Sequence, residues 1–323
     1  MGEGAQALAA LVGDELAAPF PEAARPLVGE IRRRCGDDPV AAVVFYGSCL
    51  RTGTLEGVLD FYVVVDAYRP ASASRVLAVA NALLPPNVFY LEVETPAGRL
   101  RAKYAVISLR DLARGVGTRS LRSHLWARFC QPLRAAYVRD AAAREALVGA
   151  AARSVLSALE WILPLLPDAG GAQRVRPAEF WQRAFRETYA AEMRAEGPAT
   201  IRAIYLAAPE RFDRAARAGL EDLAGRGRLA CRIEGETVYV TLETARRRRV
   251  RRVWPLRRRL AKLVTFAAQI KTAFTFGDWL PYALWKLERH TGRPVQLTAR
   301  QRRHPLLLGW PVLWQLLRER NLR

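Results

Sequence analysis

Residues 43–66 read VVFYGSCLRTGTLEGVLDFYVVVD, and this stretch decides the expected fold. An apolar strand runs into Tyr46, Gly47 and Ser48, a loop of small, turn-prone residues follows, and a second apolar strand opens around Asp60. Glycine lets the backbone approach an anionic ligand, serine adds a hydroxyl group, and amides at the start of a following helix favour phosphate oxygens. The stretch therefore predicts a phosphate-binding corner in which Asp60 supplies a carboxylate for a divalent metal ion.

The second strand carries one acid where a related pattern carries two. A Gly-Ser loop followed by an acid at a strand start resembles the polymerase-beta-type nucleotidyltransferase superfamily, whose pattern is Asp-x-Asp or Asp-x-Glu. Tyr62 occupies the place of the second acid. Asp66 shares the face of Asp60, but six residues of strand span about 20 Å, too far for one metal ion. The alternative interpretation is an ordinary glycine turn before a buried strand, with Asp60 as a turn acid or cap.

A neighbouring strand offers two other acids. Residues 88–95 predict a strand in which Glu92 and Glu94 share one face, roughly 7 Å apart. Because the site lacks its second aspartate, either glutamate could complete a magnesium site with Asp60. The alternative is that both are solvated acids on an edge strand.

Two basic residues follow. Residues 100–108 predict the second strand of a hairpin and carry Lys103, which could pair with phosphate charge or simply face solvent. Residues 121–137, which include Arg128, predict by their periodicity a helix that Pro132 stops.

Several short fragments, taken in order, resemble the mitochondrial translocator assembly and maintenance family. The fragments are Tyr46-Gly47-Ser48, Leu59-Asp60-Phe61, Val88-Phe89-Tyr90, Gly98-Arg99-Leu100 with Lys103-Tyr104-Ala105-Val106-Ile107-Ser108, and Arg128 before Gln131-Pro132. The resemblance covers about residues 40–135 and is weaker over residues 141–223. Members of this family are CTP-dependent phosphatidate cytidylyltransferases, also called CDP-diacylglycerol synthases, of the nucleotidyltransferase fold.

The resemblance implies a function and roles for particular residues. CTP and phosphatidic acid would be the substrates, and CDP-diacylglycerol and pyrophosphate the products. It implies that Gly47 and Ser48 hold the triphosphate beside Tyr46, and that Asp60 binds Mg²⁺. Lys103 and Arg128 would lie at the nucleotide or phosphatidate phosphate. The family also has an apolar residue after its Asp-Phe pair, so the missing second acid is compatible with membership. The absence of a eukaryotic-type targeting presequence favours a bacterial relative.

The composition describes an enzyme-sized globular protein with an unusual charge. The chain has 323 residues, of which 51% are hydrophobic and 25% charged, enough for two domains with cores of their own. Its net charge is +20, and residues 246–323 hold 20 of the 51 Lys and Arg residues against three acids. This concentration predicts an anionic partner for the C-terminal part, either nucleic acid or a phospholipid surface.

Cysteine usage and hydropathy bear on localisation. The cysteines lie apart with no CxxC pair, which predicts neither a zinc site nor a disulfide framework and favours a reducing compartment. The N-terminal stretch lacks the basic start and apolar run of a signal peptide. Charged residues and prolines interrupt every apolar stretch before the roughly 18 residues that a spanning helix needs. We therefore expect a cytoplasmic protein that associates peripherally with the inner face of the membrane.

The organisation expected from these patterns is an α+β chain in three parts. The parts are a nucleotidyltransferase domain (1–140), a helical, winged-helix-like domain (141–245) and a basic, Trp-rich helical segment (246–323). Apolar periodicity predicts helices over 5–19, 22–34 and 73–84. Residues 229–233 and 237–242 predict a hairpin after a helix, the outline of a winged helix. The aromatic residues expected in the helical core are Trp161, Phe180, Trp181 and Phe185.

The basic segment has the composition of a helix that lies on a membrane. Arg246–Arg249 and further arginines precede Leu263, Phe266, Ile270 and Phe274, which recur at helical spacing. Five of the eight tryptophans also lie in this segment. An anionic bilayer offers both charge and an apolar interior, so nucleic acid is the less expected partner. The alternative for the tryptophans is a packed helical core.

Two rival functions stay open. The first is nucleotidyl transfer to another acceptor, such as an RNA end or a small alcohol. The second is a basic winged-helix protein that binds nucleic acid and whose transferase site has decayed.

Overall fold

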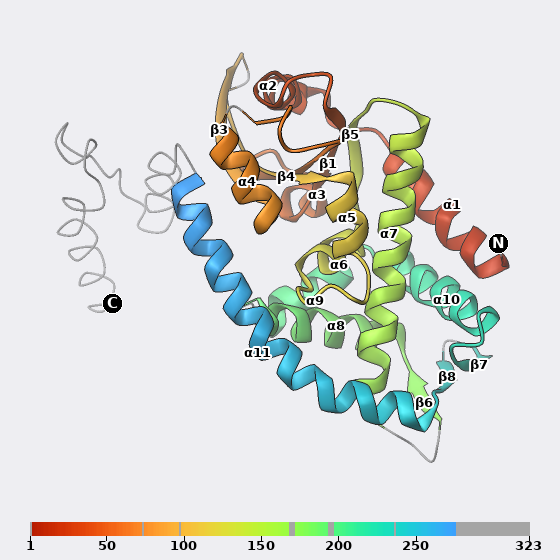
Figure 1. Ribbon diagram of the computed structural model, residues 1–323. Helices are drawn as coiled ribbons and strands as arrows, with labels where there is room; N and C mark the ends of the chain where they lie inside the picture. Colours follow the sequence, from red (N-terminus) through yellow and green to blue (C-terminus); the bar gives the residue numbers. More distant parts are fainter. Residues whose placement is uncertain are drawn as a thin grey trace, which may run out of the picture.

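The computed structural model describes residues 2–72, 74–96, 98–167, 172–192, 197–235 and 237–275. These residues form an α+β fold built on a mixed five-stranded sheet, with helices around it and a smaller sheet at one end (Figure 1). The strands are β1 (Val40–Tyr46), β2 (Val58–Val65), β3 (Asn87–Thr95), β4 (Gly98–Ser108), β5 (Arg134–Val138), β6 (Gln173–Val175), β7 (Ala230–Glu234) and β8 (Thr237–Thr241). The helices are α1 (Glu3–Ala17), α2 (Arg25–Cys35), α3 (Ser48–Thr52), α4 (Arg75–Leu83), α5 (Leu109–Gly115), α6 (His124–Phe129), α7 (Ala141–Ile162), α8 (Pro177–Ala191), α9 (Pro198–Leu206), α10 (Pro209–Gly225) and α11 (Thr244–Thr275), with short 3-10 turns η1 (Glu22–Ala24) and η2 (Leu163–Leu165).

The main sheet has the strand order β3-β4-β2-β1-β5. Strand β2 pairs with β4 in parallel, and the other neighbours are antiparallel. The register places Tyr46 opposite Asp60, Asp60 opposite Lys103, and Lys103 opposite Tyr90. Because paired residues in neighbouring strands point to the same face, these four side chains form one row across the sheet.

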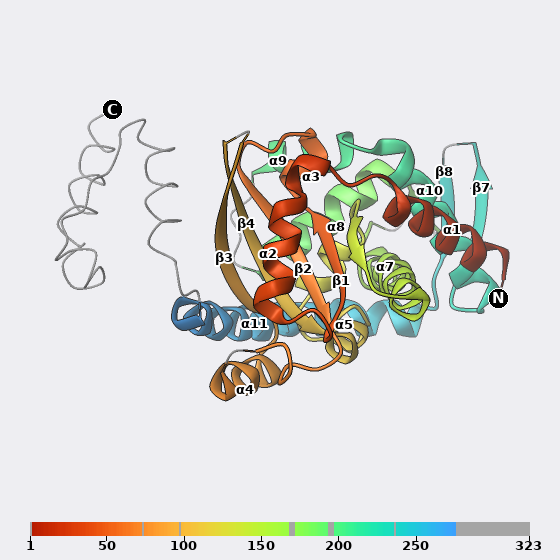
Figure 2. The same ribbon diagram turned by 90° about the horizontal axis from the view of Figure 1, so that it is seen from above.

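The two faces of the sheet are covered differently. On one face, Phe45 and Phe61 pack with Phe20 and with residues of α2, which lies across the strands (Figure 2). On the other face, Tyr62 packs against Phe129 of α6, with ring centroids 5.1 Å apart. The row of Tyr46, Asp60 and Lys103 lies on this second face, so the expected functional residues point toward the helical side of the molecule.

The apolar core does not stop at residue 140. One continuous cluster joins this second face of the sheet to α7, α8 and α10. Helix α1 packs on α10 and α7, so closely that a Cβ added at Gly4 would lie 2.4 Å from the backbone nitrogen of Asp222. A buried ion pair of 2.9 Å joins Glu15 of α1 to Arg211 of α10. The first helix therefore belongs with the helical layer, and the parts predicted as 1–140 and 141–245 share one core.

Local structure agrees with most of the sequence prediction and differs in one region. The helices predicted at 5–19, 22–34 and 73–84 correspond to α1, α2 and α4, and the predicted hairpin is β7–β8, which β6 extends to three strands. The helix predicted within 121–137, with its end at Pro132, is α6, which is shorter than predicted and ends at Phe129, and the strand β5 that follows was not predicted. Strand β5 is an edge strand paired with β1, which is distant in the sequence. The local periodicity of its five residues does not distinguish a strand from a helix, so this strand could not be predicted.

Helix α7 also corrects the hydropathy prediction. The segment Ala141–Leu165 is long and apolar enough to cross a membrane, with a mean hydropathy of 1.5 in its most apolar window. However, 67% of that window is buried inside the protein. The aromatic residues predicted for this helical core are there, with Phe180, Trp181 and Phe185 buried and Trp161 partly buried against the cluster.

Helix α11 crosses the molecule from β8 past η2 and α8 to β3 (Figure 1). Its inner face buries Trp254, whose indole donates a hydrogen bond of 2.9 Å to Glu187. Trp254 is therefore a core residue. The side chains of Leu263, Phe266 and Ile270 are exposed, by 67%, 54% and 47%. The other four tryptophans of the basic segment, and the side chain of Phe274, lie outside the described residues.

Candidate active site

The two halves of the decisive motif touch each other. Gly47 ends the first strand with φ +93° and ψ −158°, a conformation open essentially to glycine alone. A Cβ added at Gly47 would lie 2.9 Å from the Asp60 Oδ2 atom and 3.3 Å from the Asp60 Cβ atom. Helix α3 begins at the next residue, Ser48. The glycine therefore lets the β1–α3 turn lie directly against the Asp60 carboxylate.

Lys103 stands beside Asp60 on the parallel neighbour strand. The lysine Nζ atom is 3.8 Å from the Asp60 Oδ1 atom, and the side chains are 32% and 27% exposed. This is an ion pair at the edge of a cavity, weakened by the water that reaches it. An incoming phosphate could therefore attract Lys103 away from Asp60, and a divalent cation could then take the place of the lysine. Both side chains are already partly exposed, so neither would have to leave a buried position.

A cavity of about 800 Å³ opens in front of this row. The sheet, α6, the end of α8, α9 and the inner face of α11 contribute its walls. Its polar lining residues are Tyr46, Ser48, Arg51, Asp60, Tyr62, Lys103, Tyr104, Arg122, His124, Arg128, Gln131, Tyr189, Glu192, Thr200, Thr265, Gln269 and Thr272. The volume lies in the usual range of cofactor and substrate pockets, about 300–1,000 Å³. The site residues predicted around Gly47, Ser48 and Asp60, together with Lys103 and Arg128, thus share one cavity.

Arg128 enters the cavity as half of a buried ion pair. Its Nη1 atom lies 2.9 Å from a carboxylate oxygen of Glu192 and 2.8 Å from the carbonyl oxygen of His124. Burial by itself would lower the pKa of Arg128, but the Glu192 carboxylate holds that pKa well above its ordinary value. The guanidinium is therefore charged and fixed in position, with much of its charge already balanced by Glu192.

Tyr62 replaces the second acid with an aromatic ring. It is buried, and its ring stacks on Tyr46 with centroids 4.9 Å apart. Burial raises the pKa of the Tyr62 hydroxyl, so the group stays neutral at physiological pH. Tyr62, two residues after Asp60, thus places a buried aromatic ring at the position that carries the second carboxylate in the Asp-x-Asp pattern.

The predicted glutamates lie apart from Asp60. Glu92 pairs in register with Arg101, two residues beyond the row of Asp60 and Lys103. Two strand spacings and two residues along a strand separate it from Asp60 by about 12 Å. Its carboxylate accepts hydrogen bonds from Tyr90 (2.6 Å) and Arg101 (3.2 Å). The expectation that Glu92 completes the metal site is not supported, because one metal ion cannot span this distance.

Glu94 is farther out still. It lies four residues beyond the same row, opposite Arg99, and its exposed carboxylate pairs with that arginine. Neither glutamate lines the cavity. The alternative of a solvated acid on an edge strand fits Glu94, whereas Glu92 is only partly exposed and accepts hydrogen bonds from Tyr90 and Arg101. Asp66 pairs with Arg139 at 2.6 Å at the far end of β2.

The structure adds basic groups that the sequence did not single out. Arg51 lies in α3, four residues after Gly47, and Arg122 precedes α6. Burial, together with the cations Arg122, Arg128 and Lys271, holds the pKa of His124 well below its ordinary value. A sequence signal existed only for Arg51, which follows the Gly-Ser turn at helical spacing. The result is a cavity with an excess of positive charge, suited to a polyanion such as a triphosphate.

The donor set limits the metal that this corner could hold. The part of the chain that the structure describes has no cluster of three or more His, Cys, Asp or Glu residues. Asp60 and the Ser48 hydroxyl are the oxygen donors at the motif itself. Mg²⁺ is commonly bound through one or two carboxylates together with substrate phosphates and water. A single carboxylate beside a phosphate-binding turn therefore fits Mg²⁺ delivered with a nucleotide, and does not fit a structural zinc ion.

Comparison with known proteins adds no further constraint. Neither a scan of protein-family models nor a search of curated proteins gives a match to this sequence.

Proposed function

We propose that this cavity transfers CMP from CTP to the phosphate of phosphatidic acid, giving CDP-diacylglycerol and pyrophosphate. The observation that carries the proposal is the contact of Gly47 with Asp60, with Lys103 in register beside them, in one basic cavity. A turn that only glycine adopts readily, one carboxylate and several cations are what an enzyme needs to hold a triphosphate and its magnesium ion.

The residues have separate roles in this proposal. Gly47 and Ser48 would bind the triphosphate beside Tyr46, and Asp60 would hold the magnesium ion through its carboxylate. Lys103 would neutralise charge on the transferred phosphate. Arg128, fixed by Glu192, would orient the second phosphate and keep it in line for attack. Bound Mg²⁺ supplies charge neutralisation at the phosphates. The acceptor phosphate is already an anionic nucleophile at neutral pH, so the site needs no strong general base.

The fold assignment that goes with this function is also a proposal. Strand order β3-β4-β2-β1-β5, with the motif between β1 and β2, supports a nucleotidyltransferase domain. After α7, the succession of β6, helices α8 to α10 and the hairpin β7–β8, with β8 between the other two strands, supports a winged-helix-like unit that closes the cavity.

Helix α11 supports attachment to an anionic membrane surface. Its outward face carries a line of exposed apolar side chains, Leu256, Leu260, Leu263, Phe266 and Ile270. The preceding turns expose arginines to the same side. A basic stretch beside an exposed apolar stripe fits a helix that lies in the interface of a bilayer rather than one that spans it. The lipid substrate would then be reached from the surface to which the enzyme is bound.

The decisive experiment identifies the product. Purified full-length protein is incubated with each of the four NTPs, Mg²⁺ and vesicles that contain phosphatidic acid, and the lipids are analysed by mass spectrometry. We expect CDP-diacylglycerol with CTP. Asp60→Asn should reduce turnover by about 10²–10³, the loss typical of a key electrostatic group. Asp66→Asn, at the other end of the same strand, is the matched control and should stay active.

Other outcomes would favour the rival functions. Nucleotide addition to an RNA oligonucleotide or a small alcohol, with no lipid product, would favour another acceptor. No product with any NTP, together with tight binding to duplex DNA, would favour the decayed transferase. Full activity of Asp60→Asn would remove Asp60 from the site and refute the proposed mechanism.

Membrane attachment has its own test. Arg248, Arg249 and Arg252 are exposed on α11, whereas Arg246 pairs with the buried Glu160 at 3.1 Å. Changing the three exposed arginines to alanine should therefore weaken co-sedimentation with anionic vesicles without disturbing the core. Each basic residue near an anionic surface contributes about 1 kcal/mol, so the triple variant should bind roughly 100-fold more weakly. Equal vesicle binding by both proteins would refute the role of α11.

A further inference from the structure

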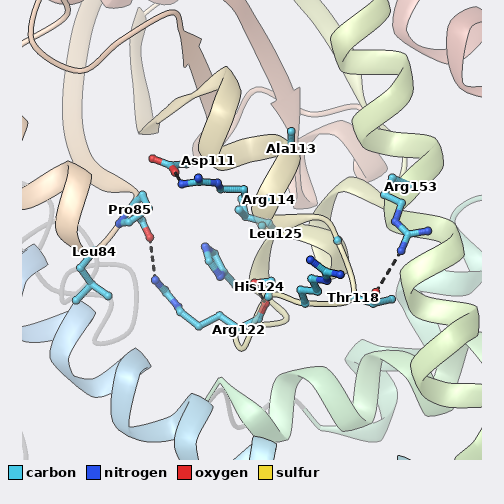
Figure 3. A pocket seen from close by; sticks show the side chains of 14 residues that line it. Leu84, Pro85, Asp111, Ala113, Arg114, Thr118, Arg122, His124, Leu125 and Arg153 are labelled. Atoms are coloured by element: carbon cyan, nitrogen blue, oxygen red, sulfur yellow. Dashed lines mark hydrogen bonds and ion pairs between the residues drawn. The ribbon is translucent and has the colours of Figure 1, made fainter. Parts of the chain in front are cut away.

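A second hollow, of about 500 Å³, lies next to the candidate active site (Figure 3). It is bounded by the segment after α4, by α5, by the loop of residues 117–123 and by α7. Arg122 and His124 line both this hollow and the Asp60 cavity, so they form a shared wall. We call the second hollow the arginine pocket, because its lining includes Arg114, Arg119, Arg122 and Arg153.

The arginine pocket has more positive than negative charge. Among the described residues, the one acid in its lining is Asp111, which is 3.8 Å from Arg114. Arg119 makes no ion pair with another described residue. Arg153, on α7, donates to Thr118 at 3.2 Å and also pairs with Glu160, which lies outside the pocket. Glu160 thus balances Arg153, and Arg114, Arg119 and Arg122 remain against the carboxylate of Asp111, an excess of positive charge that attracts an anion.

The shared wall contains three buried nitrogen atoms that have no hydrogen-bond partner among the described residues. Both ring nitrogens of His124 are buried, and neither makes a hydrogen bond within the described ranges. The Nε atom of Arg122 is also buried without a partner, although its Nη1 atom donates to the carbonyl oxygen of Pro85 at 2.8 Å. Figure 3 shows the His124 ring between Arg114 and Arg122. Buried polar groups without partners destabilise a fold, and a ligand that accepts their hydrogen bonds would remove this penalty.

Exposed apolar side chains of α4 lie close to the pocket lining. Leu83 is 79% exposed, one residue before Leu84 in the pocket lining. Val76 and Val79 continue this exposed face along α4. In both views α4 lies on the same side of the molecule as α11 (Figures 1 and 2). A basic pocket beside an apolar surface fits a ligand with an anionic head and an apolar body.

We infer that the arginine pocket is a binding site for a phosphate monoester, separate from the phosphate-binding turn at Gly47. A phosphate monoester carries about −1.5 to −2 charges at neutral pH and offers three acceptor oxygens. Arginine binds such a group through two parallel hydrogen bonds, and His124, held neutral by its burial and by its cationic neighbours, has one N–H to donate. The inference goes beyond the proposed function, because binding here needs neither CTP nor Asp60.

The test measures binding without any nucleotide. Isothermal titration calorimetry of the full-length protein would use inorganic phosphate, water-soluble dihexanoyl phosphatidic acid and, as a phosphodiester control, dihexanoyl phosphatidylcholine. The pocket variant is Arg114→Ala with Arg119→Ala, because both side chains are exposed and neither lines the Asp60 cavity. The control is Arg144→Ala, an exposed arginine of α7 outside the pocket.

We expect saturable binding of a phosphate monoester that the double variant weakens at least tenfold and that Arg144→Ala leaves unchanged. Binding of phosphatidic acid but not of free phosphate would show that the pocket takes a lipid head group. Similar binding of both would show that the phosphate alone is recognised. Either result supports the site, and Asp60→Asn should leave it intact even if transfer activity fails.

Three results would overturn the inference. The first is the absence of saturable binding of either monoester, and the second is equally tight binding of phosphatidylcholine. The third is that Asp60→Asn or Lys103→Ala abolishes binding while the double arginine variant retains it. The last result would assign the anion to the nucleotide cavity. Because binding and turnover are measured separately, failure of the pocket leaves the transferase proposal to its own test.

Discussion

Gly47→Ala should damage both the fold and the site, and the two contributions can be separated. The backbone at this glycine has φ +93° and ψ −158°, and strain in such regions costs about 1–3 kcal/mol. The added methyl group would also lie 2.9 Å from the Asp60 Oδ2 atom. Overpacking of this kind costs about 1–3 kcal/mol. We therefore expect the free energy of unfolding to fall by about 2–6 kcal/mol in total.

The control for the backbone contribution is Gly53→Ala. Gly53 has φ +67°, and a Cβ added there would meet nothing within 4 Å. A non-glycine residue in this left-handed conformation costs about 1–2 kcal/mol. The contribution of the clash is isolated by comparing Gly47→Ala with the double variant Gly47→Ala, Asp60→Ala. Alanine at position 60 removes the Oδ2 atom, so only the distance of 3.3 Å between the two Cβ atoms remains.

The assay is urea unfolding of the wild type, the single variants and the double variant, followed by circular dichroism. The double-mutant cycle should give a favourable interaction energy of about 1–3 kcal/mol, since Asp60→Ala relieves the clash but leaves the strained backbone. Additive effects of the two substitutions would refute direct contact between the turn and the carboxylate. Equal losses for Gly47→Ala and Gly53→Ala would reduce the role of Gly47 to that of an ordinary turn glycine.

Three further predictions concern buried groups. Glu192→Gln removes the partner of the buried Arg128 and should lower the free energy of unfolding by about 3–5 kcal/mol. Glu94→Gln, at an exposed pair, should change it by about 0–1 kcal/mol. Equal effects of the two substitutions in urea unfolding would contradict the buried pair. Burial lowers the pKa of Lys271 to about 8, so between that pH and about pH 10.4 the unfolded chain binds more protons than the folded chain. Over this range the free energy of unfolding of the wild type should rise with pH relative to that of Lys271→Met. A difference between the two proteins that stays constant from about pH 7.5 to 10 would refute the shifted pKa. Native labelling with a thiol reagent should modify Cys231 first, because the other three cysteines are buried; rapid labelling of several thiols would show that those sites open.

The local structure of the motif could be predicted from the sequence because it needs no distant partner. An apolar strand, a glycine followed by serine and an acid at the next strand occupy 24 consecutive residues, and each has a physical reason that needs no distant partner. The meeting of Asp60 with Lys103 could not be derived from periodicity. It depends on the parallel pairing of β2 with β4, in which the paired residues Asp60 and Lys103 lie 43 positions apart in the sequence. Only the family resemblance brought these residues together beforehand.

The alternatives that the sequence left open also depend on distant contacts. Glu92 and Glu94 share a face with Asp60, as the alternation of side chains requires, but the register slides them along β3 beyond reach of a metal ion at Asp60. The alternation of side chains determines on which face of the sheet a residue lies. It does not determine the register, that is, which residue of the neighbouring strand lies opposite. Similarly, Trp254 lies in a basic, amphipathic stretch, yet it faces the core, because α11 buries one side against η2 and α8.

The substitution of Tyr62 for a second acid agrees with the proposed chemistry. Sites with two carboxylates bind metal ions that help to deprotonate a hydroxyl nucleophile. A phosphate acceptor needs no such deprotonation, and a second carboxylate would repel it. The described cavity instead has Asp60 as its one acid outside the Arg128–Glu192 pair, with Arg51, Lys103 and Arg122 in the same lining. In the proposed reaction two anionic substrates would approach each other there, and a surplus of cations would lower the electrostatic barrier to that approach.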